Sequence, residues 1–156
     1  MINIIEGDLL QANTDIIGHQ TNCVGVFGAG IAKQIAKKYP YVKKEYTTYC
    51  KQKKPKELLG TYQISKTNSF LIANLFGQLH YGRYGEYYSK YKRQTRYNML
   101  KSALESLHND YPTQAIALPY QIGCGLAGGN WEQVKAIIDD VFNDSIVYLY
   151  KYNPKK

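Results

Sequence analysis

The chain has 156 residues, 44% of them hydrophobic, and its 20 Lys and Arg against 12 Asp and Glu give a formal net charge of +8. This length predicts one domain over residues 1–156, and the apolar fraction excludes an intrinsically disordered chain. No basic segment precedes the short apolar run at the N-terminus and no apolar stretch approaches the ~18 residues of a membrane span, so we expect a cytoplasmic protein without a membrane anchor.

Strand and helix patterns alternate along the chain. In order, they predict strands at 3–6 and 15–20, helices at 29–38 and 41–53, strands at 61–65 and 70–76, a helix at 93–109, a strand at 114–120, a helix from 130 and a strand at 145–152. Pro40 and Pro55 end the first two helices, and Asn130 with Gln133 three residues later resembles a capping box. The nearly all-apolar strand 70–76 is expected to be central in the sheet. The alternation predicts an α/β layer fold with a largely parallel or mixed sheet.

Two glycine-rich loops follow predicted strands, and each leads into a helix. The first is Gly25-Val26-Phe27-Gly28-Ala29-Gly30, and the second runs from Ile122 to Gly129. Glycine lets backbone N–H groups point at an anion, and a helix N-terminus adds unpaired donors and partial positive charge. We therefore expect the two loops to hold a diphosphate at the carboxyl edge of the sheet, with two ordinary turns as the alternative. Neither loop fits a P-loop or a complete dinucleotide-binding fingerprint.

The basic residues gather between Lys33 and Lys56. This favours anionic partners, nucleotides as well as nucleic acids, although a solvated helix face is the simpler interpretation. Cys23, Cys50 and Cys124 are odd in number and lack the spacing of metal ligands, and the histidines are equally scattered. We expect no disulfide framework, no metal site and no cofactor.

Four motifs occur in an order and spacing that resembles one known family. They are Gly7-Asp8-Leu9-Leu10, then Asn22, then Gly28-Ala29-Gly30-Ile31-Ala32, then Ile122-Gly123-Cys124-Gly125-Leu126 followed by Trp131. Over essentially its whole length the chain resembles a macrodomain, an ADP-ribose-binding module. The resemblance implies an α/β fold, a three-layer α/β/α sandwich with a central mixed sheet. It also implies ADP-ribose or ADP-ribose 1″-phosphate as the ligand; we expect a monomer, with nucleic acid as a secondary partner.

The resemblance assigns roles to individual residues. Asp8 would accept a hydrogen bond from the adenine amino group, with a turn cap as the alternative, and Asn22 would contact the distal ribose, with a turn residue as the alternative. One tyrosine of the last strand would stack on adenine, but Tyr148 and Tyr150 point to the same face of that strand, so the choice stays open. The implied ligand-binding residues are Asp8, Leu9, Asn22, Gly28, Ala29, Gly30, Ile31, Gly123, Cys124, Gly125, Leu126, Ala127, Gly128, Tyr148 and Tyr150.

Within the family, the stretch from His19 to Ala32 is most similar to the yeast-type ADP-ribose 1″-phosphate phosphatases. This implies hydrolysis of ADP-ribose 1″-phosphate to ADP-ribose and phosphate, with His19 and Asn22 as the catalytic residues. A histidine with an unperturbed pKa near ~6.5 would protonate the departing ribose oxygen or activate water. A buried core histidine is the alternative interpretation of His19. A non-catalytic module that reads or sequesters ADP-ribose, or a signal derived from it, is the second functional hypothesis.

The branch of the family that removes ADP-ribose from protein or nucleic acid is also similar, at Thr95-Arg96-Tyr97-Asn98 and in the second glycine loop. Its lysine and aspartate align with Gln78 and Ala127, which can neither form an imine nor act as a base, so this ADP-ribosyl hydrolase activity is less favoured.

The tyrosine-rich segment 77–91 is interpreted first as an exposed loop. A lid that brings His80 and Arg83 to the nucleotide comes second, and a nucleic-acid-binding element third.

Overall fold

Residues 1–80, 90–124 and 129–152 are described by the computed structural model. In chain order the elements are β1 (Ile2–Glu6), the 3₁₀ helix η1 (Leu9–Gln11), β2 (Ile16–Asn22), α1 (Gly30–Lys38), α2 (Pro40–Lys51), α3 (Pro55–Leu58), β3 (Tyr62–Lys66), β4 (Leu71–Gln78), α4 (Lys90–Asp110), β5 (Ile116–Pro119), α5 (Trp131–Val141) and β6 (Val147–Lys151). No helix in the described ranges is both long and apolar enough to span a bilayer.

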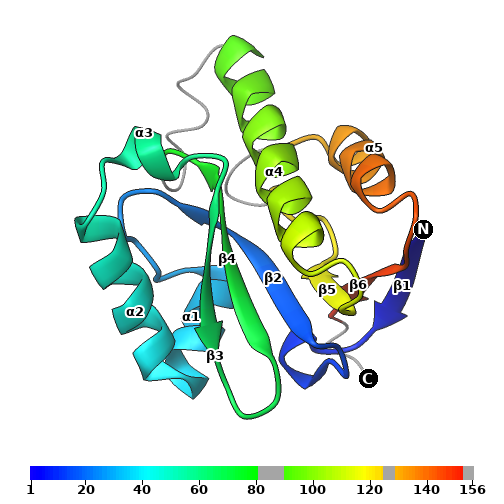
Figure 1. The fold of residues 1–156 in the computed structure, drawn as a ribbon, viewed down its shortest axis with the longest axis horizontal. Coiled ribbons are helices and arrows are strands. Elements are labelled where there is room, and N and C mark those ends of the chain that lie inside the picture. Colours follow the sequence, from blue (N-terminus) through cyan, green and yellow to red (C-terminus); the bar gives the residue numbers. More distant parts are fainter. Residues whose placement is uncertain (81–89, 125–128, 153–156) are drawn as a thin grey trace.

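The six strands form one mixed sheet in the order β1-β6-β5-β2-β4-β3. β3 pairs antiparallel with β4, and all other neighbours pair parallel. Helices α1, α2 and α3 lie on one side of the sheet, and α4 and α5 lie on the other (Figure 1). This arrangement confirms the predicted α/β/α sandwich with a mixed sheet.

Each face of the sheet buries its own hydrophobic core, because successive strand residues point to opposite faces. In β2, Ile16 packs into the cluster under α4 and α5, whereas Ile17 packs into the cluster under α1 and α2. Gly18 comes next in β2 and faces the first cluster, where a Cβ would come within 2.9 Å of Leu118 Cδ2. The absence of a side chain at Gly18 lets Leu118 fill this level of the first core.

Helix boundaries follow the sequence signals closely. Pro40 stops α1 as predicted and is also the first residue of α2, where proline loses no hydrogen bond and its fixed φ suits the helix. Asn130 is the N-cap of α5, and its side chain accepts a hydrogen bond from the Gln133 nitrogen. The short elements η1 and α3 were not predicted, because three or four residues give no periodicity to detect.

The strand predicted to be central, β4, lies one place from the edge of the sheet. Its neighbours are β2 on one side and the edge strand β3 on the other, so β2 and β5 are the middle strands. β4 is nevertheless buried on both faces along most of its length, because α4 packs on one face and the α2 residues Tyr46 and Tyr49 stack with Phe76 on the other. Burial on both faces produced the apolar run, and it does not require a central position.

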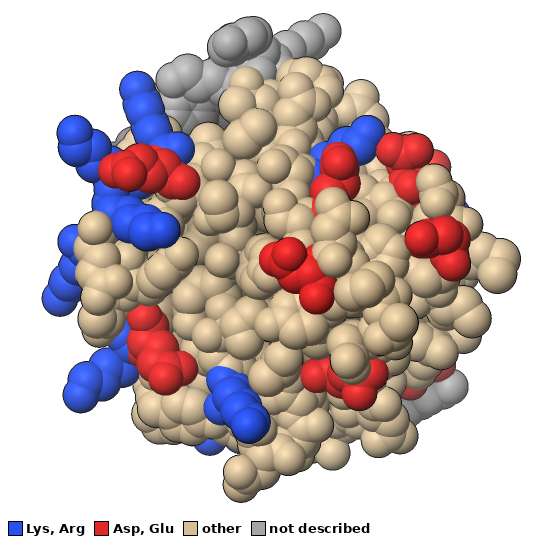
Figure 2. All heavy atoms as spheres, in the orientation of Figure 1, with Lys and Arg blue, Asp and Glu red and all other residues tan. Residues whose placement is uncertain are grey.

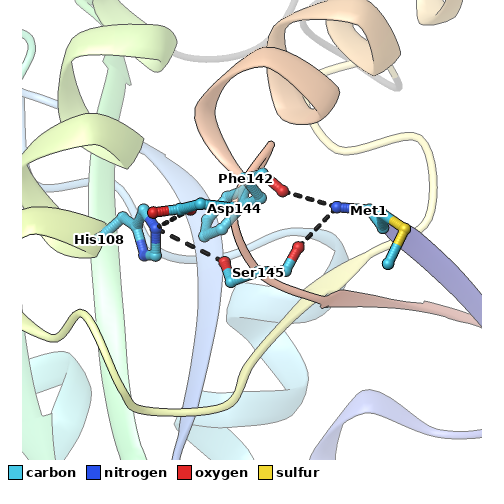
Figure 3. Close-up of polar contacts among 5 residues, drawn as sticks. All are labelled: Met1, His108, Phe142, Asp144 and Ser145. Carbon is cyan, nitrogen blue, oxygen red and sulfur yellow. Dashed lines mark hydrogen bonds and ion pairs between the residues drawn. The ribbon is translucent and has the colours of Figure 1, made fainter.

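Polar contacts fix the opposite edge of the sheet, at β1 (Figure 3). The amino nitrogen of Met1 donates to the carbonyl oxygens of Phe142 and Ser145, each at 2.6 Å. His108 Nε2 lies 2.9 Å from Asp144 Oδ1, and the hydrogen bond with this histidine lowers the pKa of Asp144. The start of β1, the end of α4 and the turn after α5 are therefore held together.

Candidate functional site

Two adjoining cavities open beside the carboxyl ends of the parallel strands. The strand-end cavity, of about 470 Å³, is lined by Gly7, Asp8, Leu9, Ile31, Gln34, Pro119, Tyr120, Gln121, Tyr150, Lys151 and Tyr152. The glycine-loop cavity, of about 580 Å³, is lined by His19, Gln20, Thr21, Asn22, Val26, Phe27, Gly28, Ala29, Gly30, Ile31, Ala32, Gln78, Pro119, Tyr120, Gln121, Ile122 and Gly123. They share four residues, so they form one cleft. Each has the roughly 300–1,000 Å³ typical of a small-ligand site.

The first glycine loop ends at an uncapped helix N-terminus. Ala29 is the N-cap of α1, its side chain makes no cap hydrogen bond, and the first turn of α1 contains no acidic residue. A Cβ placed on Gly28 or on Gly30 would meet no atom within 4 Å. The backbone at this point is therefore open to the cavity. Unpaired N–H groups and the positive end of the helix dipole make it suited to bind an anion.

The second glycine loop is closed at its base by its own backbone. Gly129 N donates to Gly123 O at 3.1 Å, and a Cβ on Gly129 would lie only 2.5 Å from that oxygen. Gly123 has a φ of +75°, and a Cβ there would lie 3.0 Å from Gln20 Oε1. Neither position accepts a larger residue without a backbone shift. Glycine at both positions keeps the loop narrow where it meets the cavity.

A strained residue stands between the two cavities. Gln121 has a φ of +59° and is the one non-glycine residue with positive φ in the described part of the chain. An ordinary residue in the left-handed region costs roughly 1–2 kcal/mol. Its carbonyl accepts from Cys124 N at 3.0 Å, which starts the second glycine loop. The strained backbone therefore lies at the sharp turn between the end of β5 and the second glycine loop.

His19 is a buried member of the cleft wall. Its Nε2 lies 2.5 Å from Asn74 Oδ1 on β4, and Asn74 Nδ2 donates in turn to Gln63 Oε1 on β3 at 2.7 Å. Since Asn74 Oδ1 can only accept, Nε2 carries the proton and Nδ1 keeps a lone pair, which is buried without a partner among the described residues. The Phe27 ring packs edge-on against the imidazole at 5.4 Å.

Burial lowers the pKa of His19 to about 4, and the hydrogen bond with Asn74 opposes this shift only in part. The imidazole is therefore neutral at neutral pH. A neutral histidine can accept a proton, but it has no acidic proton ready for a departing oxygen. A pKa of about 4 also makes the imidazole a weak base, so the burial of His19 and its hydrogen bond with Asn74 match the core-histidine alternative, and its catalytic role stays a prediction.

Asn22 uses its side chain to shape the first glycine loop. Its Oδ1 accepts from Val24 N and Val26 N, each at 3.1 Å, and its Nδ2 donates to Val26 O at 2.7 Å. The buried Tyr46 hydroxyl lies 2.6 Å from Asn22 O and 3.0 Å from Asn22 Oδ1. This is the turn role that the sequence offered as the alternative. Asn22 also lines the glycine-loop cavity, where one N–H of Nδ2 has no partner among the described residues.

The sequence pattern of the Macro domain family matches residues 19–138, which include the His19–Asn22 strand end, both glycine loops and most of α5. The chain belongs to the Macro domain family. The predicted family is thereby confirmed.

Among the relatives of this Macro domain is a protein of Lodderomyces elongisporus named ADP-ribose 1″-phosphate phosphatase. It is 30% identical over 150 residues, which cover 88% of this chain and 91% of the relative. A Mycobacterium bovis protein named DNA ADP-ribosyl glycohydrolase is 27% identical over 156 residues, 95% of this chain but 42% of that protein. The solved macrodomain of Mycobacterium tuberculosis DarG is 28% identical, with a TM-score of 0.77 over 99% of this chain and 98% of that structure.

The structure brings most of the predicted site residues of the Macro domain together. Asp8, Leu9 and Tyr150 line the strand-end cavity, and Ile31 lines both cavities. The residues that line the glycine-loop cavity are His19, Asn22, Gly28, Ala29, Gly30 and Gly123. The predictions for Gly125, Leu126, Ala127, Gly128 and Arg83 lie outside the described residues.

Two predicted residues lie near the cleft without lining it. Tyr148 is one step deeper in β6 than Tyr150 and pairs with Ala117, whereas Tyr150 pairs with Pro119 at the strand end. Of the two tyrosines, only Tyr150 lines the strand-end cavity. The half-buried Cys124 turns its Sγ toward Ile122 O at 3.5 Å. The adenine-stacking role of either tyrosine stays a prediction.

Asp8 combines both roles considered for it. Its Oδ1 accepts from Leu10 N at 3.0 Å and caps η1, as the turn-cap alternative predicts. Its other carboxylate oxygen has no hydrogen-bond partner among the described residues, and the residue lines the strand-end cavity. Capping therefore fixes the carboxylate and leaves Oδ2 for a ligand.

Gln20, Tyr120 and Lys151 were not predicted as cleft residues, and Gln78 was named only as the position that aligns with the lysine of the glycohydrolase branch. Gln20 Nε2 donates to Gln78 Oε1 at 2.6 Å, and Gln78 Nε2 donates to His80 O at 2.8 Å. These hydrogen bonds link the ends of β2 and β4 along one wall of the glycine-loop cavity. In the strand-end cavity, Lys151 Nζ lies 4.9 Å from the centre of the Tyr120 ring. Their place in the sequence could have identified them. Gln20, Gln78, Tyr120 and Lys151 stand at or near the carboxyl ends of β2, β4, β5 and β6, where ligands bind in α/β sheets.

The three thiols are poor nucleophiles. Burial, helped by the nearby Cys50, raises the pKa of Cys23 to about 12. Burial also raises the pKa of Cys50 and of Cys124. Because the thiolate is the reactive form, burial disfavours these cysteines as nucleophiles at neutral pH.

Proposed function

We propose that the cleft binds ADP-ribose and that the chain hydrolyses ADP-ribose 1″-phosphate to ADP-ribose and phosphate. The observation that carries the proposal is the uncapped N-terminus of α1, where Gly28 and Gly30 leave the backbone open to the glycine-loop cavity. Membership of the Macro domain family and a 30% identical relative named for this reaction support it.

The two cavities match the two ends of this ligand. The adenosine occupies the strand-end cavity, where Asp8 Oδ2 accepts from the adenine amino group and Tyr150 packs against the base. The diphosphate lies at the N-terminus of α1, whose N–H groups neutralise its charge. The distal ribose and its 1″-phosphate occupy the glycine-loop cavity beside Asn22 and Gly123.

Hydrolysis requires little covalent chemistry from the protein. Water attacks the phosphorus, the bond between phosphorus and the 1″-oxygen breaks, and the proton of the attacking water passes to His19 Nδ1. The departing 1″-oxygen takes up a proton from solvent, and the protonated His19 then returns its proton to solvent. Charge that develops on the phosphoryl oxygens is stabilised by backbone N–H donors, which are fixed before the reaction begins. The neutral state of His19, with its partner-free Nδ1 lone pair, supports the role of a proton acceptor.

A non-catalytic ADP-ribose-binding module is the second candidate. The observation that favours it is the burial of His19, whose Nδ1 has no access to solvent and whose ring packs against Phe27. Gln78 adds to this, because its amide is hydrogen-bonded to Gln20 at the position where the glycohydrolase branch aligns a lysine. A site of this composition retains ligand recognition even without turnover.

Phosphorus NMR with ADP-ribose 1″-phosphate tests both candidates. The phosphatase proposal expects the monoester resonance to give way to inorganic phosphate while the diphosphate resonances shift but persist. A shift of the resonances without hydrolysis selects the binding module. Unperturbed diphosphate resonances would overturn the proposed site altogether.

A matched pair of glycine variants separates binding from folding. Gly28→Ala adds a methyl group where nothing lies within 4 Å, so we expect an unchanged melting temperature and at least tenfold weaker ADP-ribose binding by calorimetry. Gly60→Ala is the control, because Gly60 has a φ of +87° and a Cβ there would lie 3.0 Å from Met99 Sδ, away from the cleft. It should lower the melting temperature and leave the affinity intact. Equal affinities for wild type and Gly28→Ala would refute the phosphate cradle.

A further inference from the structure

The positive charge of this protein is concentrated in one segment. Residues 30–66 contain ten lysines and two glutamates, a formal charge of +8 that equals the net charge of the whole chain. Outside this segment ten basic and ten acidic residues cancel. Such a separation creates a surface of strongly positive potential on an otherwise neutral molecule.

The segment forms α1, α2, α3 and β3, which lie on one side of the molecule (Figure 1). Lys and Arg side chains gather over this side, whereas Asp and Glu prevail toward α5 (Figure 2). All ten lysines are exposed, and we name them the lysine face: Lys33, Lys37, Lys38, Lys43, Lys44, Lys51, Lys53, Lys54, Lys56 and Lys66.

The charge of the lysine face is not neutralised from within. None of its lysines forms an ion pair with another residue in the described ranges, where the ion pairs are Lys101 with Asp140 and His108 with Asp144. Two of its lysines lie instead over aromatic rings. Lys38 Nζ is 5.6 Å from the Tyr39 ring centre, and Lys53 Nζ is 5.1 Å from that of Tyr49. The ammonium groups of the lysine face, free of ion pairs within the described ranges, are therefore available to an external anion.

A shallow hollow crosses the lysine face between α2 and the edge strand β3. It has a volume of about 380 Å³ and is lined by Lys44, Glu45, Thr48, Tyr49, Gln52, Gln63 and Ile64. Lys44, Thr48 and Gln52 supply donors there and Glu45 adds one negative charge, whereas the Tyr49 ring is already in contact with Lys53 and Phe76. The exposed aromatic ring of this segment is Tyr41. Basic side chains beside an exposed aromatic ring are typical of surfaces that follow a single strand, neutralising phosphates while bases stack.

We propose that the lysine face binds the phosphate backbone of single-stranded nucleic acid, at a surface separate from the ADP-ribose cleft. A membrane fits this face poorly, because of the large hydrophobic residues that are exposed in the described chain only Tyr41 belongs to residues 30–66. The same lack of exposed apolar side chains disfavours a protein partner, whose interface needs an apolar centre. Repeated unpaired lysines over three helices match a polyanion of regular charge spacing.

Fluorescence anisotropy with a labelled oligothymidine of about 20 nucleotides tests the proposal. The test variant is K44Q/K51Q, whose two positions lie seven residues apart on the outer side of α2. The control is K101Q/K135Q, which removes the same charge from α4 and α5. Loss of two phosphate contacts lowers the magnitude of the slope of log K against log salt by about 1.4. With equal affinities at 1 M salt, this corresponds to about 25-fold weaker binding at 0.1 M salt. The control should bind within about twofold of wild type.

Several results would overturn the proposal. Equal losses in the test and control variants would show a response to bulk charge alone. Displacement of the oligonucleotide by saturating ADP-ribose would place the strand in the cleft. Tighter binding to duplex DNA, to polyglutamate or to phosphatidylserine vesicles would assign the surface to another partner. If circular dichroism shows that K44Q/K51Q does not fold, K38Q/K54Q replaces it. We expect the same loss of about 25-fold in oligonucleotide affinity for this second variant.

Discussion

Replacing His19 by glutamine should flatten the pH dependence of folding stability below pH 7. Burial lowers the pKa of His19 from 6.5 to about 4. Between these values the unfolded chain takes up a proton that the native state excludes, so the stabilisation is complete above pH 6.5 and declines as the pH falls toward 4. Linkage over this interval gives a loss of about 2 kcal/mol for the wild type between pH 7.5 and pH 5.

Urea unfolding at pH 7.5, 6.5, 5.5 and 5.0, followed by circular dichroism, measures this difference. The free energy of unfolding of the wild type should fall relative to that of His19→Gln as the pH is lowered. His108→Gln is the matched control, because it removes a histidine that pairs with the exposed Asp144 outside the cleft. Parallel pH curves for wild type and His19→Gln would refute the neutral buried imidazole. The NMR titration of His19 is an independent check, since its ring proton shifts should stay constant from pH 7 to 5.

Three further substitutions test the wall of the cleft. Asn22→Ala removes the acceptor of two backbone N–H groups and a partner of the buried Tyr46 hydroxyl. We therefore expect the free energy of unfolding in urea to fall by about 2–3 kcal/mol, and an unchanged value would contradict the turn role. Gly129→Ala places a methyl group 2.5 Å from a backbone oxygen, so calorimetry should find at least tenfold weaker ADP-ribose binding; wild-type affinity would show that the loop base is not needed. Tyr150→Ala should weaken ADP-ribose binding more than Tyr148→Ala does, because only Tyr150 lines the cavity, and the reverse order would move the adenine site.

Features encoded within a few residues could be predicted from the sequence. The end of α1 at Pro40, the cap at Asn130 and the two glycine loops all depend on local backbone preferences. The turn role of Asn22 belongs here too, because two of its partners, Val24 and Val26, are within four residues. Such signals need no knowledge of the rest of the fold.

Features that arise from distant contacts could not be predicted. His19 is neutral because the fold buries it, with Phe27 packed edge-on against its ring. Asn74, 55 residues away in the sequence, accepts the hydrogen bond that Nε2 donates. The left-handed backbone of Gln121 has no sequence signal, since glycine would be the expected residue at that φ. The amide pair of Gln20 and Gln78 likewise exists only once β2 and β4 lie side by side. Strand neighbours decide each of these properties.

The separation of charge described for residues 30–66 also bears on how fast a small anion reaches the cleft. α1 joins the two regions, because Gly30 lines the cleft and Lys33 and Lys37 follow on the same helix. A ligand that carries a diphosphate is therefore drawn toward this side of the molecule before it makes any contact. Added salt should slow its association and leave its dissociation rate unchanged, because screening acts on the approach and the bound ligand is held by fixed backbone donors.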